Sequence, residues 1–435
     1  MRMSANTELV SDRIEDIIDA LTKKFGTSDL SRIPDMEKLD ALCHAIGLSP
    51  SQLDDLISGN SPVMRTITGH VFEVFFDRLM KSNGMIVRTV GGDEAVDRIV
   101  NGLSIQLKTP TKSGTKGKMV MYKTHKTHGA KSETESEEYY HSKSSFPDLL
   151  VGLISYDPLR VLFLKRDSLP IHSSLKDRIK SPFTIEWRQH PGLNAWSELG
   201  LKTLIVPDWA KSLRPGANEP LPKTASMIGL PSGFILDAIL QKENFRIWNM
   251  NIRGFAREVA FVFQLRAHDA RPFKPSDCRK DRADKADVCL RDASTKKSVF
   301  FQVKGVTKDQ CSYEKGNPIL AIETQLSRGR VNDHPTQSRL YYASDFDFLI
   351  LSLEPYTSDL CHVAAGQTPD HGWDYYCIPT SRFSRHPSYP SRLKSMQKIA
   401  YQELQQYRVD EKWYKRWEKA PQTQKSTSWF VLPTL

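Results

Sequence analysis

Apolar residues in the first 60 positions recur at the spacing of amphipathic helices. Over residues 8–25 they fall on one helical face, at Val10, Ile14, Ile17, Ile18 and Leu21. A second helix is predicted over residues 35–46, because Gly47 suits its end, and Ser49 followed by Pro50 suits the start of a short third helix. We therefore predict a small N-terminal helical region over residues 1–61.

Two of these helices and the glycine turn between them outline a helix-turn-helix, a motif that reads DNA. The second helix of the pair is acidic at Asp54 and Asp55, whereas phosphate contacts favour Lys or Arg. A plain helical lid or a dimerisation arm is therefore the alternative interpretation of this region.

Beyond residue 62 a helical pattern is followed by β-rich apolar runs. The Pro-rich stretch 208–224 has no hydrophobic period and is typical of a linker, and after it the same order of elements begins again. We expect a mixed α/β (α+β) fold with two tandem domains, 62–207 and 225–435. Residues 396–419 are predicted to form a C-terminal helix whose aromatic face packs on the second domain.

The same short motifs occur twice along the chain, in the same order. The matched pairs and their separations are Gly69/Gly254 and Glu73/Glu258 (185), Asp97/Asp287 (190), and Gln106/Gln302 and Lys108/Lys304 (196). Further on, Tyr140/Tyr342, Phe146/Phe346 and Asp148/Asp347 follow at separations of 202, 200 and 199. Loop insertions between the motifs produce such small changes in the separation of the matched residues. We call Glu73, Asp97, Gln106 and Lys108 the first quartet, and Glu258, Asp287, Gln302 and Lys304 the second quartet.

Strand periodicity predicts how each quartet comes together. The Gln and Lys of each quartet are two residues apart in an apolar β-rich run, so they share one face of a strand. Asp97 heads a run that ends at Asn101-Gly102, a two-residue hairpin signal, and Asp287 heads a run that ends in a polar turn. Each hairpin is expected to bring its Asp beside the Gln-x-Lys of the next strand, with the Glu supplied by the preceding helix.

Two carboxylates, an amide oxygen and a lysine at one point suit phosphodiester hydrolysis. Hard oxygen ligands favour Mg²⁺, and we expect Mn²⁺ to substitute for it. The ion activates water for attack on phosphorus and neutralises the charge that grows on the phosphate. The lysine orients or helps to deprotonate that water and stabilises the transition state.

This arrangement resembles the PD-(D/E)XK nuclease superfamily, in the Glu–Asp–Gln-x-Lys form of Mrr-type and TnsA-type nucleases. The resemblance covers about residues 62–207 and 225–410. It implies two restriction-endonuclease-like domains, each a mixed β-sheet flanked by helices. It also implies that both quartets are catalytic and that the Glu, Asp and Gln of each hold the metal. The chain departs from the family's name twice, because Val96 and Ala286 stand where the proline would be, and Gln replaces the second acidic residue.

Other assignments of the acidic residues remain open. Pro147-Asp148 with Lys165 has the literal Pro-Asp pair and a well-spaced lysine, but Phe163 stands where an acid or amide is needed. Asp148 also matches Asp347 in the repeat, so we predict core strands over 147–154 and 346–353 instead. Three aspartates remain possible substitutes for those of the quartets: Asp93, Asp281 and Asp284.

Charge favours a polyanionic partner. The chain has 435 residues, a formal net charge of +10 and a pI near 9.1. The lysine-rich segment after Lys108 suits a loop on the DNA backbone, with a solvated surface insertion as the alternative. Its expected DNA-binding residues are Lys112, Lys116, Lys118, Lys123 and Lys126. The same segment contains His125-x-x-His128, which has no third metal ligand at a useful spacing.

The cysteines and the hydropathy of the chain indicate its cellular compartment. The six cysteines include no CxxC pair, which indicates neither a zinc site nor a disulfide framework and fits a reducing cytoplasm. No apolar run approaches the roughly 20 residues of a membrane span. We therefore expect a cytoplasmic protein with no membrane partner.

Together these patterns predict a Mg²⁺-dependent endonuclease of double-stranded DNA. A type II restriction endonuclease with two catalytic centres, each cutting one strand, is the leading interpretation, with a DNA methyltransferase as its cognate partner and a monomer or homodimer as the working form. The alternatives are a transposon-end or repair nuclease of the same superfamily, a nicking enzyme with one active copy, and a non-catalytic DNA-binding regulator.

Overall fold

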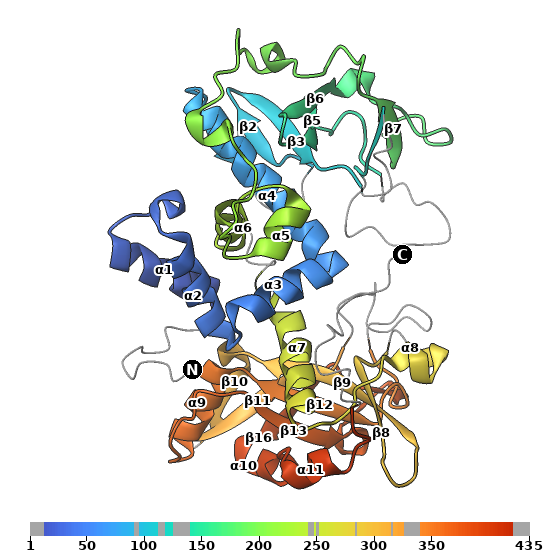
Figure 1. Ribbon diagram of the computed structural model, residues 1–435. Helices are drawn as coiled ribbons and strands as arrows, with labels where there is room; N and C mark the ends of the chain where they lie inside the picture. The colour runs from blue at the N-terminus through green and yellow to red at the C-terminus, as the bar shows by residue number, and fades with distance from the viewer. Residues whose placement is uncertain are drawn as a thin grey trace. The chain divides into compact units, whose positions relative to one another are not determined.

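The fold is mixed α/β and divides into two compact units (Figure 1). The computed structural model describes residues 13–90, 95–111, 118–124, 140–241, 248, 252–282, 285–314, 316–325 and 340–420. One unit, here the inserted unit, is residues 61–247. The other, here the split unit, combines residues 1–60 with residues 248–435.

The inserted unit is a five-stranded sheet with a long helix, α4, as its first element. Its helices are α4 (Ser61–Ser82), α5 (Pro222–Ile228) and α6 (Ser232–Ile239). Its strands are β1 (Val87–Thr89), β2 (Arg98–Val100), β3 (Leu103–Lys108), β4 (Met119–Tyr122), β5 (Leu149–Ser155), β6 (Arg160–Lys165) and β7 (Phe183–Glu186). The sheet order is β1-β2-β3-β5-β6, and β4 pairs separately with β7.

The β2–β3 hairpin forms where the sequence predicts it. Asn101 and Gly102 both have positive φ, 48° and 89°, as a two-residue turn between right-twisted strands requires. Val100 pairs with Leu103 and Arg98 with Ile105. The predicted core strands are also present, because β5 covers most of 147–154 and runs parallel to β3.

The split unit has the larger set of elements. Its helices are α1 (Ile14–Phe25), α2 (Asp35–Ile46), α3 (Pro50–Gly59), α7 (Arg253–Ala267), α8 (Pro275–Cys278), α9 (Pro355–Ala364), α10 (Tyr401–Leu404) and α11 (Glu411–Lys415). Its strands are β8 (Val288–Arg291), β9 (Ser298–Val306), β10 (Cys311–Glu314), β11 (Asn317–Glu323), β12 (Phe348–Leu353), β13 (Asp374–Pro379), β14 (Arg385–His386), β15 (Tyr389–Leu393) and β16 (Met396–Ala400). One sheet has the order β13-β12-β9-β8, and another has the order β10-β11-β16.

Alternating side chains of the four-stranded sheet enter two different cores. Phe301 and Val303 of β9 pack with Phe261 of α7 and Trp417, on the side where Figure 1 draws α7 along the sheet. Phe300, from the opposite face of the same strand, packs with a cluster that includes residues of β11 and α10. This two-sided burial explains why apolar residues occur on both faces of the strand.

The two main sheets have the same connectivity. In the inserted unit β2-β3 is antiparallel, β3-β5 parallel and β5-β6 antiparallel. In the split unit β8-β9 is antiparallel, β9-β12 parallel and β12-β13 antiparallel. A helix, α4 or α7, precedes each series. The repeat seen in the sequence therefore corresponds to the same order of elements in both units.

The N-terminal helices belong to the split unit. Helix α2 ends at Gly47 in the left-handed conformation, and Ser49 forms a capping box at the start of α3, as predicted. Helix α3 contacts α7, and the indole Nε1 of Trp373 donates to the Gly47 carbonyl at 3.3 Å. These contacts, made between segments more than 190 residues apart, are what join residues 1–60 to the second half of the chain.

The boundaries of the units differ from those expected. Residues 1–61 do not stand apart, and residues 208–224 lie inside the inserted unit, where Leu213 and Leu221 are buried, rather than between domains. Helices α5 and α6 follow that stretch within the same unit, and α6 contacts α4. Burial of these leucines is the feature that a proline-rich composition concealed.

The predicted helix over residues 396–419 is wrong in its first part. Residues 396–400 form β16, which pairs antiparallel with β11, and only the short α10 and α11 follow. The aromatic side chains do pack on this unit, since Tyr401, Tyr414 and Trp417 are buried. Among the described helices of both units, none is long and apolar enough to cross a membrane.

Candidate active site

In the first quartet, two backbone hydrogen bonds fix the aspartate beside the strand that carries Gln-x-Lys. The Asp97 N–H donates to the Ile105 carbonyl at 2.9 Å. The Leu107 N–H donates to Asp97 Oδ2 at 2.7 Å. Asp97 therefore lies beside β3 between Gln106 and Lys108, as the hairpin argument predicts.

The second quartet has the same two hydrogen bonds. The Asp287 N–H donates to the Phe301 carbonyl at 2.8 Å, and the Val303 N–H donates to Asp287 Oδ2 at 2.7 Å. Phe301 and Val303 lie 196 residues after Ile105 and Leu107, the same separation as between the two glutamines. Both aspartates are thus held in one way by equivalent strands.

Gln106 and Lys108 extend the first quartet along β3. The Lys108 ammonium lies 4.0 Å from Asp97 Oδ2. The Gln106 side chain is 3% exposed, and its Nε2 donates to the Ala95 carbonyl at 3.0 Å. Its Oε1 is buried and accepts no hydrogen bond from the described residues. An amide oxygen in this position is an available ligand.

Glu73 of α4 completes the first quartet but is already paired. Arg98 Nη2 lies 3.1 Å from Glu73 Oε2, and His70 Nδ1 lies 3.3 Å from Glu73 Oε1. Burial opposes ionisation of Glu73, but the hydrogen bond and charge of His70, followed by the charge of Arg98, outweigh it and lower the pKa of Glu73 to about 2. Glu73 is therefore a carboxylate at neutral pH.

Arg98 is a residue of this site that the sequence interpretation missed. Its side chain is buried, and besides Glu73 it binds Asp77, with Nε 2.8 Å from Asp77 Oδ1. A signal existed in the sequence. Arg98 and Val100 are two residues apart on a short strand, so their side chains share one face. If Val100 is buried, the charged side chain of Arg98 is buried too and needs a carboxylate partner.

Glu258 of α7 is the glutamate of the second quartet, and it differs from Glu73 in its surroundings. Among the described residues, no hydrogen bond or ion pair reaches its carboxylate. Burial and the neighbouring charge of Asp287 raise the pKa of Glu258 well above its ordinary value, against the opposing charge of Lys304. Burial likewise raises the pKa of Asp287 to about 6, although Lys304 partly offsets it.

The other two residues of the second quartet are anchored near Asp287. The Gln302 Nε2 donates to Asp287 Oδ2, and the Gln302 side chain is 5% exposed. The Lys304 ammonium donates to the Gln325 carbonyl at 3.3 Å and lies 5.4 Å from the centre of the Tyr341 ring. The structure thus brings Gln302 to Asp287, and the charges of Asp287 and Lys304 act on Glu258 in opposite directions.

These donor sets fit a divalent cation. Each contains two carboxylates and an amide, which are hard oxygen ligands. The Oε1 of Gln106 is buried and the carboxylate of Glu258 is half-buried, and neither has a hydrogen-bond partner among the described residues, so a cation would satisfy both. In the second quartet the Gln302 amide presents nitrogen to Asp287, so half a turn about its last torsion would present oxygen instead.

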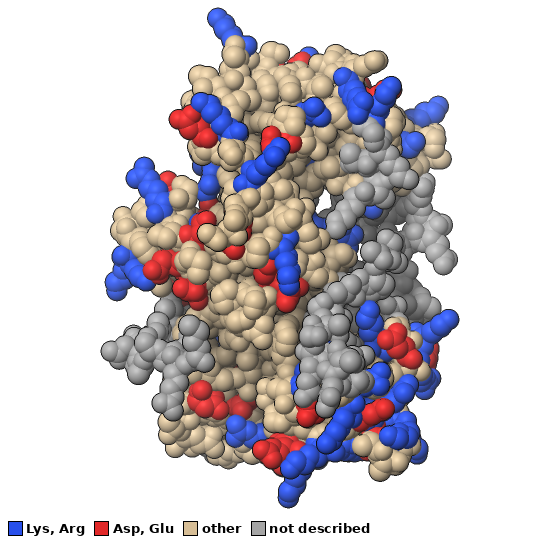
Figure 2. All heavy atoms as spheres, viewed as in Figure 1, with Lys and Arg blue, Asp and Glu red and all other residues tan. Residues whose placement is uncertain are grey.

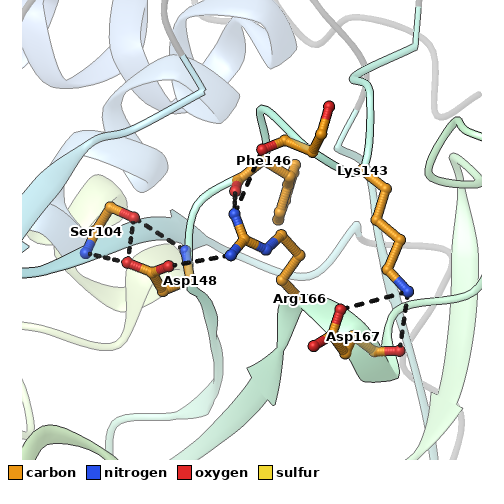
Figure 3. Close-up of polar contacts among 7 residues, drawn as sticks. Ser104, Lys143, Phe146, Asp148, Arg166 and Asp167 are labelled. Atoms are coloured by element: carbon orange, nitrogen blue, oxygen red, sulfur yellow. Dashed lines mark hydrogen bonds and ion pairs between the residues drawn. The ribbon is translucent and has the colours of Figure 1, made fainter.

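The alternative assignment, Asp148 with Lys165, lies at the other end of the same strands. Asp148 precedes β5 and accepts hydrogen bonds from the N–H and hydroxyl of Ser104 at 3.0 and 2.7 Å (Figure 3). Arg166 lies 3.4 Å from Asp148 Oδ1, and Figure 3 shows its guanidinium between Asp148 and the Phe146 carbonyl. Lys165 points elsewhere and pairs with Glu198 at 3.0 Å.

The equivalent residue of the split unit has the same place. Asp347 Oδ2 accepts from the Phe300 N–H at 2.9 Å, and Phe300 is the counterpart of Ser104. Both aspartates therefore fasten the start of one parallel strand to its neighbour. Asp281, another alternative, is an exposed partner of Arg279 at 2.6 Å, whereas Asp93, Asp284, His125 and His128 lie outside the described residues.

Two of the five expected DNA-binding lysines can be placed. Lys118 and Lys123 are exposed and flank β4, whereas Lys112, Lys116 and Lys126 lie outside the described residues. On the face that Figure 2 shows, the described Lys and Arg side chains are interspersed with Asp and Glu. Helix α3 has no Lys or Arg and buries Leu53 and Asp54, so its composition fits a packing helix better than a reading helix.

A further group of potential ligands lies in the split unit, where atoms of Asp359, His362 and Asp370 come within 4.8 Å of one another. These side chains have other partners. His362 Nε2 lies 2.9 Å from Asp374 Oδ2, and Asp359 Oδ2 lies 2.6 Å from His371 Nδ1. This network is separate from both quartets.

Comparison with known proteins gives no relative: no family model, no curated protein and no solved structure matches this chain.

Proposed function

We propose that this protein is a Mg²⁺-dependent endonuclease of double-stranded DNA, of the type II restriction kind, related to the PD-(D/E)XK nucleases through two copies of one catalytic domain. One observation carries the proposal. The same four residue types recur in both units, and in each the aspartate is fixed beside Gln-x-Lys by the same two backbone hydrogen bonds. An accidental Asp and Gln-x-Lys would not reproduce these contacts twice.

Each residue has a defined task in the proposed reaction. Glu and Asp of a quartet hold the cation, and the Gln amide oxygen completes the protein's share of ligands. Mg²⁺, when bound, polarises the scissile phosphate and lowers the pKa of water. The lysine, two residues beyond the glutamine on the same strand face, binds and orients the attacking water and offsets charge that grows on the phosphate.

A duplicated catalytic domain suits duplex DNA. The two strands are antiparallel and related by a local two-fold axis, so two related domains in one chain can do the work of a symmetric dimer. Non-identical halves also accommodate an asymmetric recognition sequence. A DNA methyltransferase that protects the same sequence is the partner this function requires, and the working form is then a monomer or a homodimer.

Plasmid cleavage tests the proposal directly. Supercoiled plasmid and phage DNA are incubated with Mg²⁺ and with wild type, Lys108→Ala, Lys304→Ala or the double variant. We expect discrete linear fragments from wild type, slower or nicked products from the single variants, and loss of cleavage by at least about a hundredfold from the double variant.

The matched control is Asp148→Asn, which changes a carboxylate of the inserted unit outside the quartet and should leave cleavage intact. Wild-type protein that binds every DNA substrate and cuts none of them would contradict the nuclease proposal, and would favour a DNA-binding regulator.

A further inference from the structure

The surroundings of the two glutamates differ, although the quartets match. In the inserted unit Glu73 has three charged or titratable neighbours, which are His70, Asp77 and Arg98. At the separations of the repeat, 185 residues on the helix and 190 on the strand, the split unit has Phe255, Val262 and Val288 in their places.

Arg98 and His70 lie next to the two oxygens of Glu73. Its Oε2 lies 3.1 Å from Arg98, and its Oε1 lies 3.3 Å from His70. Arg98 is 2% exposed and is held from a second side by Asp77 at 2.8 Å, while its Nη1 donates to the Asp97 carbonyl at 2.8 Å. The guanidinium is therefore a fixed cation beside two residues of the first quartet.

Among its described residues, the split unit places no such cation at the matched positions. Val262 and Val288 pack in the same hydrophobic cluster between α7 and the sheet, where Asp77 and Arg98 form their ion pair in the inserted unit. Among the described residues, nothing hydrogen-bonds or ion-pairs with the Glu258 carboxylate, and Lys304 is directed to the Gln325 carbonyl. The charge of Asp287 acts on Glu258, and no arginine of the described residues forms an ion pair with either carboxylate.

We propose that the two centres are unequal: the second quartet takes up the divalent cation in the free protein, and in the first quartet Arg98 occupies the glutamate that a cation would need. This rests on the proposed function and assigns its metal-dependent step first to the split unit.

The physical reason is the cost of releasing a buried ion pair. A cation that binds Glu73 competes with Arg98 and His70 for its carboxylate oxygens, and Arg98, which is 2% exposed, would then keep Asp77 as its ion-pair partner. No pair has to be broken at Glu258. We therefore expect the first quartet to bind Mn²⁺ at least about tenfold more weakly than the second.

Mn²⁺ binding to the full-length protein tests the inference without DNA. Free Mn²⁺ is measured by electron paramagnetic resonance during titration of wild type, Glu258→Gln and Glu73→Gln. We expect one tight equivalent per chain in wild type. Glu258→Gln should lose this equivalent, and Glu73→Gln should keep it. Asp148→Asn serves as a carboxylate control with unchanged binding.

Exchange of the surrounding residues provides the reciprocal test. Asp77→Val with Arg98→Val gives the first quartet the surroundings of the second and should add a second tight equivalent. Val262→Asp with Val288→Arg places the ion pair beside Glu258 and should weaken the tight site by about tenfold or more. Circular dichroism checks that each double variant is folded, and the single Glu→Gln variants decide the matter if a double variant is not.

The outcomes separate this inference from the proposed function. Two equivalents of equal affinity, or a tight equivalent that depends on Glu73 and not on Glu258, would overturn the inequality while cleavage of plasmid DNA by wild type still supports the nuclease. Absence of both Mn²⁺ binding and cleavage would overturn the proposed function and the inference with it.

Discussion

Glu354 has no exposed surface and is held by two arginines of α7. Arg253 Nη2 lies 2.6 Å from its Oε2, and Arg257 Nε donates to its Oε1 at 2.8 Å. Burial alone would raise the pKa of Glu354, but the charges of Arg253 and Arg257 lower it. These ion pairs link the start of α9 to α7, the helix that carries Glu258.

Protonation of Glu354 should therefore weaken the split unit in acid. Because the pKa is lower in the folded than in the unfolded state, where it is near 4.3, the stabilisation is full above about pH 4.3 and is lost as pH falls further. We expect Glu354→Gln to lower the free energy of unfolding by about 3 kcal/mol at pH 7 and to flatten the decrease below pH 4.3. Hydrogen exchange of the β12 amides, measured at pH 7 and below pH 4.3, reports the stability of the split unit.

The matched control is Glu403→Gln, which breaks a pair with Arg382 that is about half exposed (43% and 54%). An exposed pair of this kind contributes less than about 1 kcal/mol, so the control should change β12 exchange little. An equal effect from both substitutions would show that burial does not determine the strength of the Glu354 pair.

At the scale of elements, each helix that carries a quartet glutamate has a glycine one turn earlier. Gly69 precedes Glu73 and Gly254 precedes Glu258 by four residues, so each glycine shares a helical face with its glutamate. A Cβ added at either glycine meets no atom within 4 Å. The helix thus leaves free space beside the carboxylate, although glycine is a poor helix former.

Gly69→Ala should separate stability from activity. Alanine improves the interior of α4 by about 0.5–1 kcal/mol, because it reduces the freedom of the unfolded chain. If DNA approaches the quartet through this space, the methyl group displaces the phosphate, and cleavage falls by about tenfold or more in Gly69→Ala or Gly254→Ala. Urea unfolding and plasmid cleavage measure the two effects, and unchanged cleavage in both variants would place the DNA on another side.

Local sequence was sufficient to predict some elements and not others. The Asn101–Gly102 turn and the Gly47 helix end follow from backbone conformations that those residues adopt readily, so neighbouring residues determine them. Strand β16 was predicted as helix because Met396-Gln-Lys-Ile-Ala400 consists largely of good helix formers. Its pairing with β11, some 75 residues earlier, decides the conformation, and a local pattern does not contain that partner.

The quartets show the same division between local and distant information. Repetition identified Asp, Gln and Lys, since their spacing within a hairpin is local. The Arg98–Asp77 ion pair joins a strand to a helix 21 residues earlier and breaks the repeat rather than repeating, so a search for repeated residues passes over it. Comparison of the residues that differ at matched positions would have found it.

At the scale of the whole molecule, the inserted unit is continuous in sequence and the split unit is not. We predict that residues 61–247, expressed alone, fold cooperatively, because the unit carries its own sheet and helices. Residues 248–435 alone should be much less stable than in the full chain, since they lose the helices that cover α7 and α9. Thermal unfolding followed by circular dichroism measures both fragments.

Adding the missing segment provides the control for this prediction. A separate peptide of residues 1–60 should restore the transition of fragment 248–435 and leave that of fragment 61–247 unchanged. If fragment 248–435 unfolds cooperatively at the unfolding temperature of the full chain, α1–α3 do not contribute to the stability of this unit.

The division of one unit across the two ends of the chain also determines the order in which it can fold on the ribosome. Residues 1–60 emerge first, but α7, on which α3 rests, follows only after the 187 residues of the inserted unit. At about 5–20 residues per second this separation lasts roughly 10–40 s, and in that interval the inserted unit can close. The surfaces of α2 and α3 that contact α9 and α7 then have no partner, so we expect this segment to bind chaperones while the rest of the chain is synthesised.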